Sequence, residues 1–241
     1  MTARVDALLR IAEIKDYPNA LNGLQVANDG NVTKIAAAVD ACEAVLTQAV
    51  EAGADLLIVH HGLFWSGLEP VTGAAHRKLS LCLKNNLAVY SAHLPLDEHA
   101  ELGNNALLCD ALGLPADRQP FLTSGVQVDF QIDRAELLTR LSQAVGGRVH
   151  LAPGGPDQTR KIGVVTGGAG GAISQAAAEG VDTFITGEGP HWSYTAAEEL
   201  GVNLLYAGHY ATETFGVKAL AAYLEKEFGV SWFFIDHPTG L

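Results

Sequence analysis

Short hydrophobic runs alternate with helix-length segments along most of this chain. The runs are continuous rather than alternating in polarity, which is typical of parallel strands that are buried on both faces. The intervening segments, such as 42–52 and 172–179, are each followed by a glycine that can cap a helix. This pattern predicts an α/β fold built on parallel sheets. The expected strands of this kind are residues 35–39, 56–59, 87–90, 162–165, 183–185 and 202–206.

The middle of the chain has a different pattern. Residues 126–132 alternate in polarity as a half-exposed strand does. Asp133 and Glu136 then form a capping box for a following helix. The preceding segment, 114–125, contains two prolines and is the predicted boundary between two α/β lobes. The predicted parts are a first lobe over 1–122 and a second over 123–241, the latter completed by a helix over 213–228 and a last strand over 232–235.

The two predicted lobes resemble each other in sequence. Residues 34–62 align without a gap on residues 161–189, which predicts an internal duplication of a strand, helix and strand. At the end of this unit the first copy has two histidines, whereas the second has a glycine and a glutamate, so the copies differ where chemistry is expected. The differing residues are His60 and His61 in the first copy and Gly187 and Glu188 in the second.

Composition excludes several classes of protein. A content of 48% hydrophobic and 17% charged residues is that of a folded globular protein. The formal net charge of -12 argues against sequence-independent binding of nucleic acid, which needs clustered Lys and Arg. No hydrophobic run is long enough to span a membrane, and residues 1–16 have the pattern of an amphipathic helix rather than a signal peptide. We therefore expect a cytoplasmic protein, in which Cys42, Cys82 and Cys109 are buried, reduced thiols.

A His-x3-acid pattern occurs twice, as His93 with Asp97 and as His209 with Glu213. Each copy follows a predicted strand, and ligands bind beyond the carboxyl ends of the strands in open α/β sheets. His209 and Glu213 are four residues apart at the start of a predicted helix, so their side chains lie on one face. This doubled pattern favours metal binding over the alternative that strand-end histidines are only structural.

His60 and His61 also end a predicted strand, and neighbouring strand residues point to opposite sides. They would therefore serve two ions more easily than one. Histidine and carboxylate ligands suit Zn, Fe, Mn or Ni, between which the sequence does not decide. Two such ions about 3.5–4 Å apart can activate water for hydrolysis. The sequence predicts a dinuclear centre in which Glu213 is the best candidate to bridge the ions.

Two further segments allow more than one interpretation. Residues 166–171 (TGGAGG) could bind a phosphate, but the pattern lacks a following Lys-Ser/Thr, and a tight glycine turn is favoured. His191 and Trp192 fit the wall of a pocket and simple packing equally well. No Gly-x-Ser-x-Gly motif is present, so nothing supports covalent catalysis.

Taken together, the motifs resemble the Nif-three-like family, whose members are called GTP cyclohydrolase 1 type 2 homologues or dinuclear metal centre hexameric proteins. The resemblance covers nearly the whole chain and matches the short bacterial form without an inserted domain. The motifs are NGLQV at 22–26, VHHGLFW at 59–65, HLPLD at 93–97, LGNN at 102–105, ITGE at 185–188 and GHYATE at 208–213.

The resemblance implies a ligand set, a fold and an assembly. It implies two similar α/β lobes with two divalent metal ions in the cleft between them, and a toroidal homohexamer. His93 and Glu188 are then expected beside the metals, in a supporting or proton-transfer role. Two functions stay open: a metal-dependent hydrolase of a small, nucleotide-like substrate, which we favour, and a non-catalytic carrier of metal or a metallocofactor. The implied metal ligands are His60, His61, Asp97, His209 and Glu213.

Overall fold

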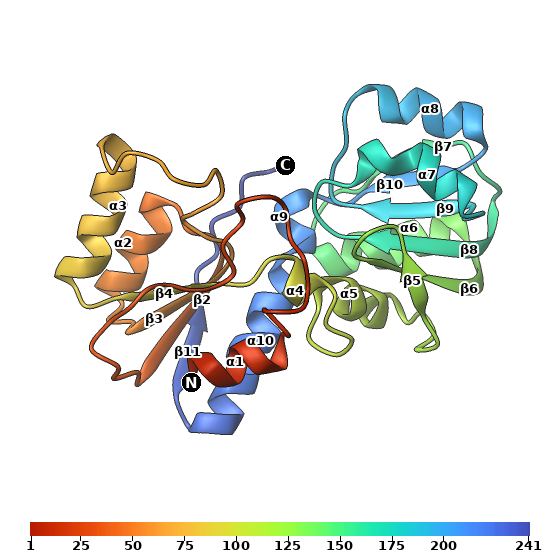
Figure 1. Ribbon diagram of the computed structural model, residues 1–241. Coiled ribbons are helices and arrows are strands. Elements are labelled where there is room, and N and C mark those ends of the chain that lie inside the picture. The colour runs from red at the N-terminus through yellow and green to blue at the C-terminus, as the bar shows by residue number, and fades with distance from the viewer. The chain divides into compact units, whose positions relative to one another are not determined.

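The computed structural model describes residues 1–241 and contains two sheets, each at the centre of its own contact unit (Figure 1). Unit 1 comprises Met1–His99 and Gly216–His237, and unit 2 comprises Ala100–Phe215 and Pro238–Leu241. The predicted α/β class is confirmed.

Unit 1 is built on a five-stranded, mostly parallel sheet. Its elements are α1 (Thr2–Leu8), β1 (Gly23–Val26), β2 (Lys34–Asp40), α2 (Glu43–Glu51), β3 (Leu56–His61), α3 (Gly73–Lys84), β4 (Ala88–Ser91), α4 (Leu94–Asp97), most of α10 (Thr214–Phe228) and β11 (Ser231–Phe234). The strand order is β1-β4-β3-β2-β11, and only β1 is antiparallel to its neighbour. Helices α2 and α3 cover one face, and α10 lies on the other (Figure 1).

Unit 2 is built on a six-stranded mixed sheet. Its elements are α5 (Asn104–Leu112), β5 (Gln119–Phe121), β6 (Gly125–Asp133), α6 (Arg134–Val145), β7 (His150–Pro153), β8 (Gln158–Val165), η1 (Gly170–Ala172), α7 (Ile173–Ala178), β9 (Thr183–Thr186), α8 (Trp192–Leu200), β10 (Asn203–Tyr206) and α9 (His209–Thr212). The order is β5-β6-β8-β9-β10-β7, with β8, β9 and β10 parallel. Helices α5 and α6 pack on one face, and α7 and α8 on the other.

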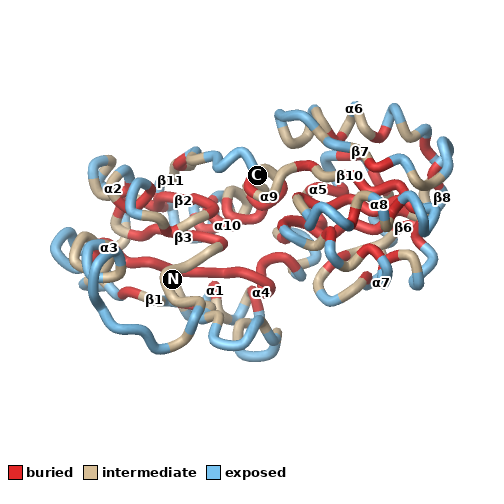
Figure 2. The backbone as a smooth tube through the Cα atoms, turned by 90° about the horizontal axis from the view of Figure 1, so that it is seen from above, coloured by how far each residue is buried: buried red, intermediate tan, exposed pale blue.

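The central strands are buried on both faces, as their continuous hydrophobic runs predict (Figure 2). In β8, Val164 packs in the core beneath α5 and α6, whereas the next residue, Val165, packs in the core beneath α7. The capping box is also confirmed, because the Asp133 side chain accepts hydrogen bonds from the backbone N–H groups of Ala135 and Glu136. Cys82 and Cys109 are buried free thiols, and Cys42 is half-buried.

The division of the chain between the two units differs from the sequence prediction. The last strand was expected to complete the second lobe, but β11 pairs with β2 in the sheet of unit 1. The expected boundary after residue 122 also lies too late, since Leu108, Leu112 and Leu114 pack in the core of unit 2. Hydrophobic patterning identifies elements but not the sheet that each one joins.

The N-terminal segment also departs from its pattern, which predicted a helix over 1–16. The helix α1 ends at Leu8, and Arg10 has a positive φ of 53°, which an α-helix does not allow. The remaining residues up to Asp16 therefore leave the helix and are available to support another part of unit 1.

The aligned segments of the two units make matching hydrogen bonds. Asp55 accepts bonds from the backbone N–H groups of Thr33 and Lys34, and Asp182 accepts them from Arg160 and Lys161. The two aligned lysines also donate to matching carbonyl oxygens, Lys34 to Ala52 and Lys161 to Glu179. The internal duplication remains a prediction, which these shared contacts support.

Candidate metal centre

Unit 1 gathers three histidines and an acid at the carboxyl ends of two strands. His60 and His61 are the last residues of β3, and His93 and Asp97 belong to the turn and short helix that follow β4. Because β3 and β4 are parallel neighbours, these ends meet at one edge of the sheet. One ligand nitrogen from each of the three histidines lies within 4.8 Å of the others. Asp97 Oδ2 lies 3.5 Å from His60 Nε2, so the acid belongs to the same cluster.

Each of these histidines has its Nδ1 atom held by an acceptor. His60 Nδ1 lies 2.9 Å from the carbonyl oxygen of Ala92. His61 Nδ1 lies 2.8 Å from Asp40 Oδ1, and His93 Nδ1 lies 2.8 Å from Asp16 Oδ1. Carbonyl and carboxylate oxygens only accept hydrogen bonds, so Nδ1–H donates and Nε2 carries the lone pair in the neutral ring. This is the arrangement in which metal-binding histidines are usually held.

Unit 2 gathers one histidine and two acids in the same manner. His209 Nδ1 lies 2.8 Å from Glu188 Oε1, and His209 Nε2 lies 3.1 Å from Glu213 Oε1. Glu213 is buried, with 3% of its surface exposed. The hydrogen bond with Glu213 raises the pKa of His209 to about 9, against the opposing effect of burial, and Glu188 adds to the rise. A cation, either a proton or a metal ion, is therefore favoured between Nε2 and Glu213.

Gly167 provides the space in which Glu213 lies. Its φ is +73°, and a Cβ atom there would stand 2.2 Å from Glu213 Oε1. The neighbouring Gly187 is similarly confined, because a Cβ would stand 2.6 Å from the Cα of His209. Here the glycines of the 166–171 segment make a tight turn against the acid, which matches the favoured interpretation of that segment.

Two supporting acids were missed from the sequence. Asp40 ends β2 opposite His61 in the parallel register, so a search for acids at strand ends could have found it. Asp16 lies in an irregular segment, and no pattern indicates its role. Burial acts to raise the pKa of Asp16, but hydrogen bonds from His93 and Asn22 outweigh it and lower this pKa to about 2. Asp16 is therefore an ionised partner for the ring of His93.

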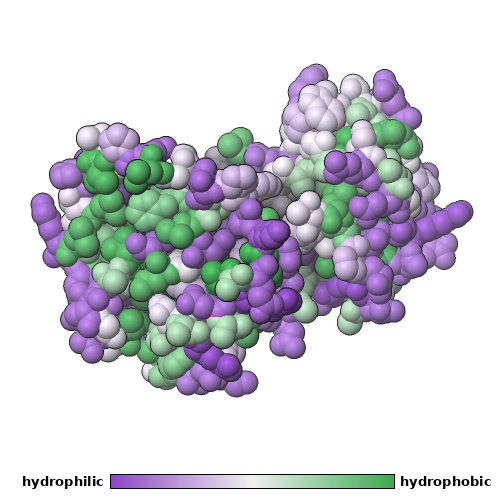
Figure 3. All heavy atoms as spheres, in the orientation of Figure 1, coloured by the Kyte–Doolittle hydropathy of each residue, from purple (hydrophilic) through white to green (hydrophobic).

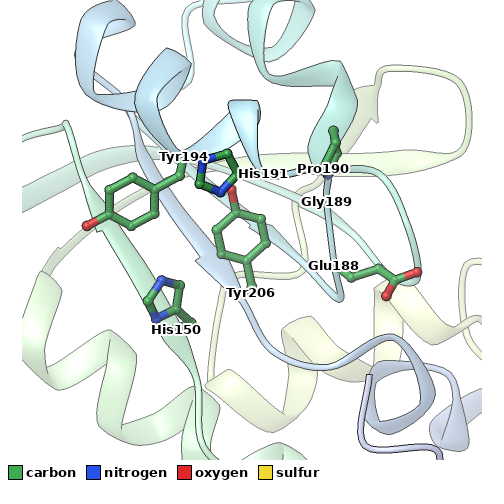
Figure 4. Close-up of a pocket in the computed structure, with 7 residues that line it drawn as sticks. All are labelled: His150, Glu188, Gly189, Pro190, His191, Tyr194 and Tyr206. Atoms are coloured by element: carbon green, nitrogen blue, oxygen red, sulfur yellow. The ribbon is translucent and has the colours of Figure 1, made fainter.

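A separate pocket of about 500 Å³ lies in unit 2 (Figure 4). Glu188 is part of its wall, so the pocket adjoins the acid that holds His209. His191 also lines it, whereas Trp192, 52% exposed, is not among the lining residues. The lining residues are His150, Glu188, Gly189, Pro190, His191, Tyr194 and Tyr206.

Comparison with known proteins assigns the chain to a family. The profile of the family described as Duf34/NIF3 (NGG1p interacting factor 3) matches residues 1–240. The chain belongs to the Duf34/NIF3 family. A Halobacterium salinarum protein named GTP cyclohydrolase 1 type 2 homolog is 43% identical, and the match covers 100% of this chain and 98% of that protein. A Deinococcus radiodurans protein of the same name is 41% identical over 93% of this chain and 88% of its own length.

Solved structures agree with this assignment. A crystal structure of a Thermus thermophilus protein superposes with a TM-score of 0.93 and 42% identity, covering 100% of this chain and 98% of that one. The resemblance seen in the motifs is therefore confirmed for family and fold. In this Duf34/NIF3 protein the His and Glu groups described above could hold a metal ion. None of its helices has the length and hydrophobicity needed to cross a membrane.

Proposed function

We propose that this protein holds two divalent metal ions and uses them to hydrolyse a small, nucleotide-like substrate. The proposed ligands are His60, His61, Asp97, His209 and Glu213, with Glu213 bridging. The observation that carries the proposal is the common orientation of the histidines, each of which presents Nε2 because an oxygen acceptor holds its Nδ1. Imidazole and carboxylate together suit Zn, Fe, Mn or Ni.

When bound, such ions lower the pKa of water and polarise the bond that is attacked. The side chains around them have separate tasks. His93 can accept a proton at Nε2, because Asp16, held at its Nδ1, stabilises the imidazolium that forms. Glu188 holds the ring of His209 through Nδ1 and so fixes the direction of Nε2. His93 is thus the proposed proton acceptor, and Glu188 is a positioning residue.

The class of substrate is inferred from the names of relatives and from the charge of the chain. Relatives carry the name GTP cyclohydrolase 1 type 2 homolog, which suggests a nucleotide-like molecule. The net charge of -12 disfavours an anionic substrate over most of the surface. Two divalent cations would reverse the charge locally, so a phosphate or a polarised C–N bond could still be bound at the centre.

A metal and turnover screen tests the proposal. Protein purified without chelator is analysed for metal after incubation with Zn, Mn, Fe or Ni, and is then assayed with nucleotides, cyclic amides and phosphoesters. His60→Ala is the test variant, and His76→Ala, which removes an exposed histidine of α3, is its control. We expect two ions per chain and a metal-dependent turnover that His60→Ala abolishes and His76→Ala preserves.

Other outcomes are equally informative. Tight, exchangeable metal without turnover across the panel would favour the carrier, whereas no bound metal would refute both functions.

The variant His93→Ala tests whether His93 is the proton acceptor and not a metal ligand. It should retain both ions while lowering turnover by roughly 10²- to 10⁴-fold. Unchanged metal content and unchanged turnover in this variant would leave His93 with a structural role only.

We also propose that the protein is a homohexamer, as the family resemblance implies. Most of its exposed large hydrophobic side chains come from unit 1, over which Figure 3 shows hydrophobic residues among hydrophilic ones. If the assembly is the hexamer that the resemblance implies, light scattering gives a mass near six chains, and a monomer mass across a range of concentrations would contradict this. The exposed large hydrophobic side chains in residues 17–83 are Tyr17, Leu21, Leu24, Leu68, Val71 and Leu83.

A further inference from the structure

The pocket in unit 2 has aromatic walls on neighbouring elements. His150 on β7 and Tyr206 on β10 are directly opposite each other in the antiparallel register. Their rings are nearly parallel, with centroids 6.0 Å apart and an angle of 29° between the planes. Tyr194 on α8 also lies beside His150, with centroids 5.5 Å apart and an angle of 33°. Figure 4 shows these three rings grouped at one side of the pocket.

The ring of Tyr206 is held in place by contacts that do not depend on a ligand. Tyr206 Oη lies 2.7 Å from Ser193 Oγ, and Ser193 Oγ lies 2.6 Å from the carbonyl oxygen of Pro190. Ser193 is fully buried, so this hydrogen-bonded chain is shielded from water. A preformed aromatic wall loses little conformational entropy when a ligand binds.

The polar groups of the pocket restrict what can bind. Its lining contains no Lys or Arg, so it lacks the cations that usually hold a phosphate. Glu188 and His191 add hydrogen-bonding groups, which a purely hydrophobic ligand would leave unsatisfied. A volume of about 500 Å³ is within the range of small-molecule sites. Flat aromatic faces beside a few polar groups are the features that bind a planar, nitrogen-containing ring.

Glu188 connects this pocket with the metal ligand His209. Its carboxylate holds His209 Nδ1 at 2.8 Å, while the same residue forms part of the pocket wall. In Figure 4 this carboxylate lies across the pocket from the three rings. A ring stacked on Tyr194 or Tyr206 would therefore place the rest of its molecule toward Glu188.

We propose that this pocket binds the planar nitrogen heterocycle of the substrate, a nucleobase-sized ring stacked against His150, Tyr194 and Tyr206. The proposal rests on the function proposed above, because it supplies the substrate class for the same centre. Phosphate or sugar groups of the substrate lie outside the ring-binding pocket.

Calorimetric titration of the full chain, freed of metal with a chelator, tests this proposal without any turnover. The probes are guanosine and cytidine, with ribose 5-phosphate as a probe that lacks the ring. The test variants Tyr194→Leu and His150→Leu each remove one ring from a position that is not fully buried. Tyr194→Phe retains the ring, and Phe228→Leu removes a half-exposed ring from α10 in unit 1 as a control.

We expect at least one nucleoside to bind and ribose 5-phosphate not to bind. Loss of a stacking ring should weaken the nucleoside Kd by roughly 5- to 150-fold, whereas Tyr194→Phe and Phe228→Leu should bind like the wild type. Wild-type affinity for the nucleoside in both Tyr194→Leu and His150→Leu, or no binding of either nucleoside, would overturn the proposal. Metal content is measured in parallel. This second measurement uses wild-type protein without chelator. Absence of bound metal there would refute the dinuclear centre, whereas the nucleoside titration alone decides whether the pocket binds the ring.

Discussion

The two sheets end in the same way but with different residues. In unit 1, β3 ends with the proposed ligand His61. The aligned residue of unit 2 is Glu188, which is not a proposed ligand but accepts a hydrogen bond from His209 Nδ1. Asp40, which supports His61, aligns with Gly167, whose lack of a side chain makes room for Glu213. Two aligned strand-helix-strand segments can therefore differ in which of their positions provide proposed ligands and which provide supporting residues.

The largest expected effect comes from removing the acid of each set in turn. Glu213→Gln and Asp97→Asn keep the shape of the side chain and remove its charge. Because Glu213 is the proposed bridge, Glu213→Gln should weaken the binding of both ions by more than about 100-fold, beyond the loss seen for supporting residues. Asp97→Asn should weaken one ion more than the other. Metal titration with mass-spectrometric counting of ions decides this, and equal losses in the two variants would exclude a special role for Glu213.

The glycine that faces Glu213 allows a matched test. Gly167→Ala and Gly180→Ala both place a side chain at a positive φ, +73° and +80°, and each should cost about 1 kcal/mol of stability. Only at Gly167 would the new Cβ meet Glu213, since nothing lies within 4 Å of a Cβ at Gly180. Metal affinity should therefore fall by about 100-fold in Gly167→Ala alone. A similar fall in Gly180→Ala would mean that backbone strain, not the clash, is responsible.

The supporting acids should have smaller effects that differ between the units. Asp16→Asn and Glu188→Gln each weaken the hold on one histidine, and such changes cost roughly 10- to 100-fold in metal affinity or activity. The side chain of Asp16 is 5% exposed and that of Glu188 is 42% exposed, so the buried acid should have the larger effect. Glu51→Gln, at the exposed end of α2, is the control for loss of an acid. A larger loss of activity in Glu188→Gln than in Asp16→Asn would contradict this prediction.

The smallest effect concerns stability and pH. Burial acts to raise the pKa of Asp55, but hydrogen bonds from Thr33 and Lys34 outweigh it and lower this pKa. The resulting stability is present above the unfolded pKa of about 3.9 and is lost as pH falls through the lower folded pKa. Asp55→Asn should therefore cost about 1–3 kcal/mol in the free energy of unfolding at pH 7 and less in acid.

The aligned acid of unit 2 provides the comparison for this effect. Asp182 receives longer backbone bonds, of 2.9 and 3.4 Å, than the 2.7 and 3.0 Å at Asp55, so Asp182→Asn should cost less. Urea unfolding of both variants at pH 7 and pH 3 measures the difference. A cost at Asp55 that does not change with pH would show that its charge does not contribute.

The sequence predicted the central strands and the strand-end residues well, because both depend on local patterns. Continuous hydrophobic runs identified β2, β3, β8 and β9, and the doubled histidine pattern identified residues that lie at strand ends. The sheet joined by β11 was not predictable, since its partner β2 is distant in the sequence and any buried edge would accept the same side chains. Asp16 was missed for a similar reason, because its partner His93 is brought to it only by the fold.

The pairing of β11 with β2 has a consequence for the order in which the chain is made. Unit 2 is continuous from Ala100 to Phe215, apart from four residues at the C-terminus, whereas unit 1 receives its edge strand from the end of the chain. A chain emerging from the ribosome therefore has all of the unit 2 strands before it can close the sheet of unit 1. Throughout that interval the hydrogen-bonding edge of β2 lacks its strand, and unpaired edges of this kind are prone to aggregation.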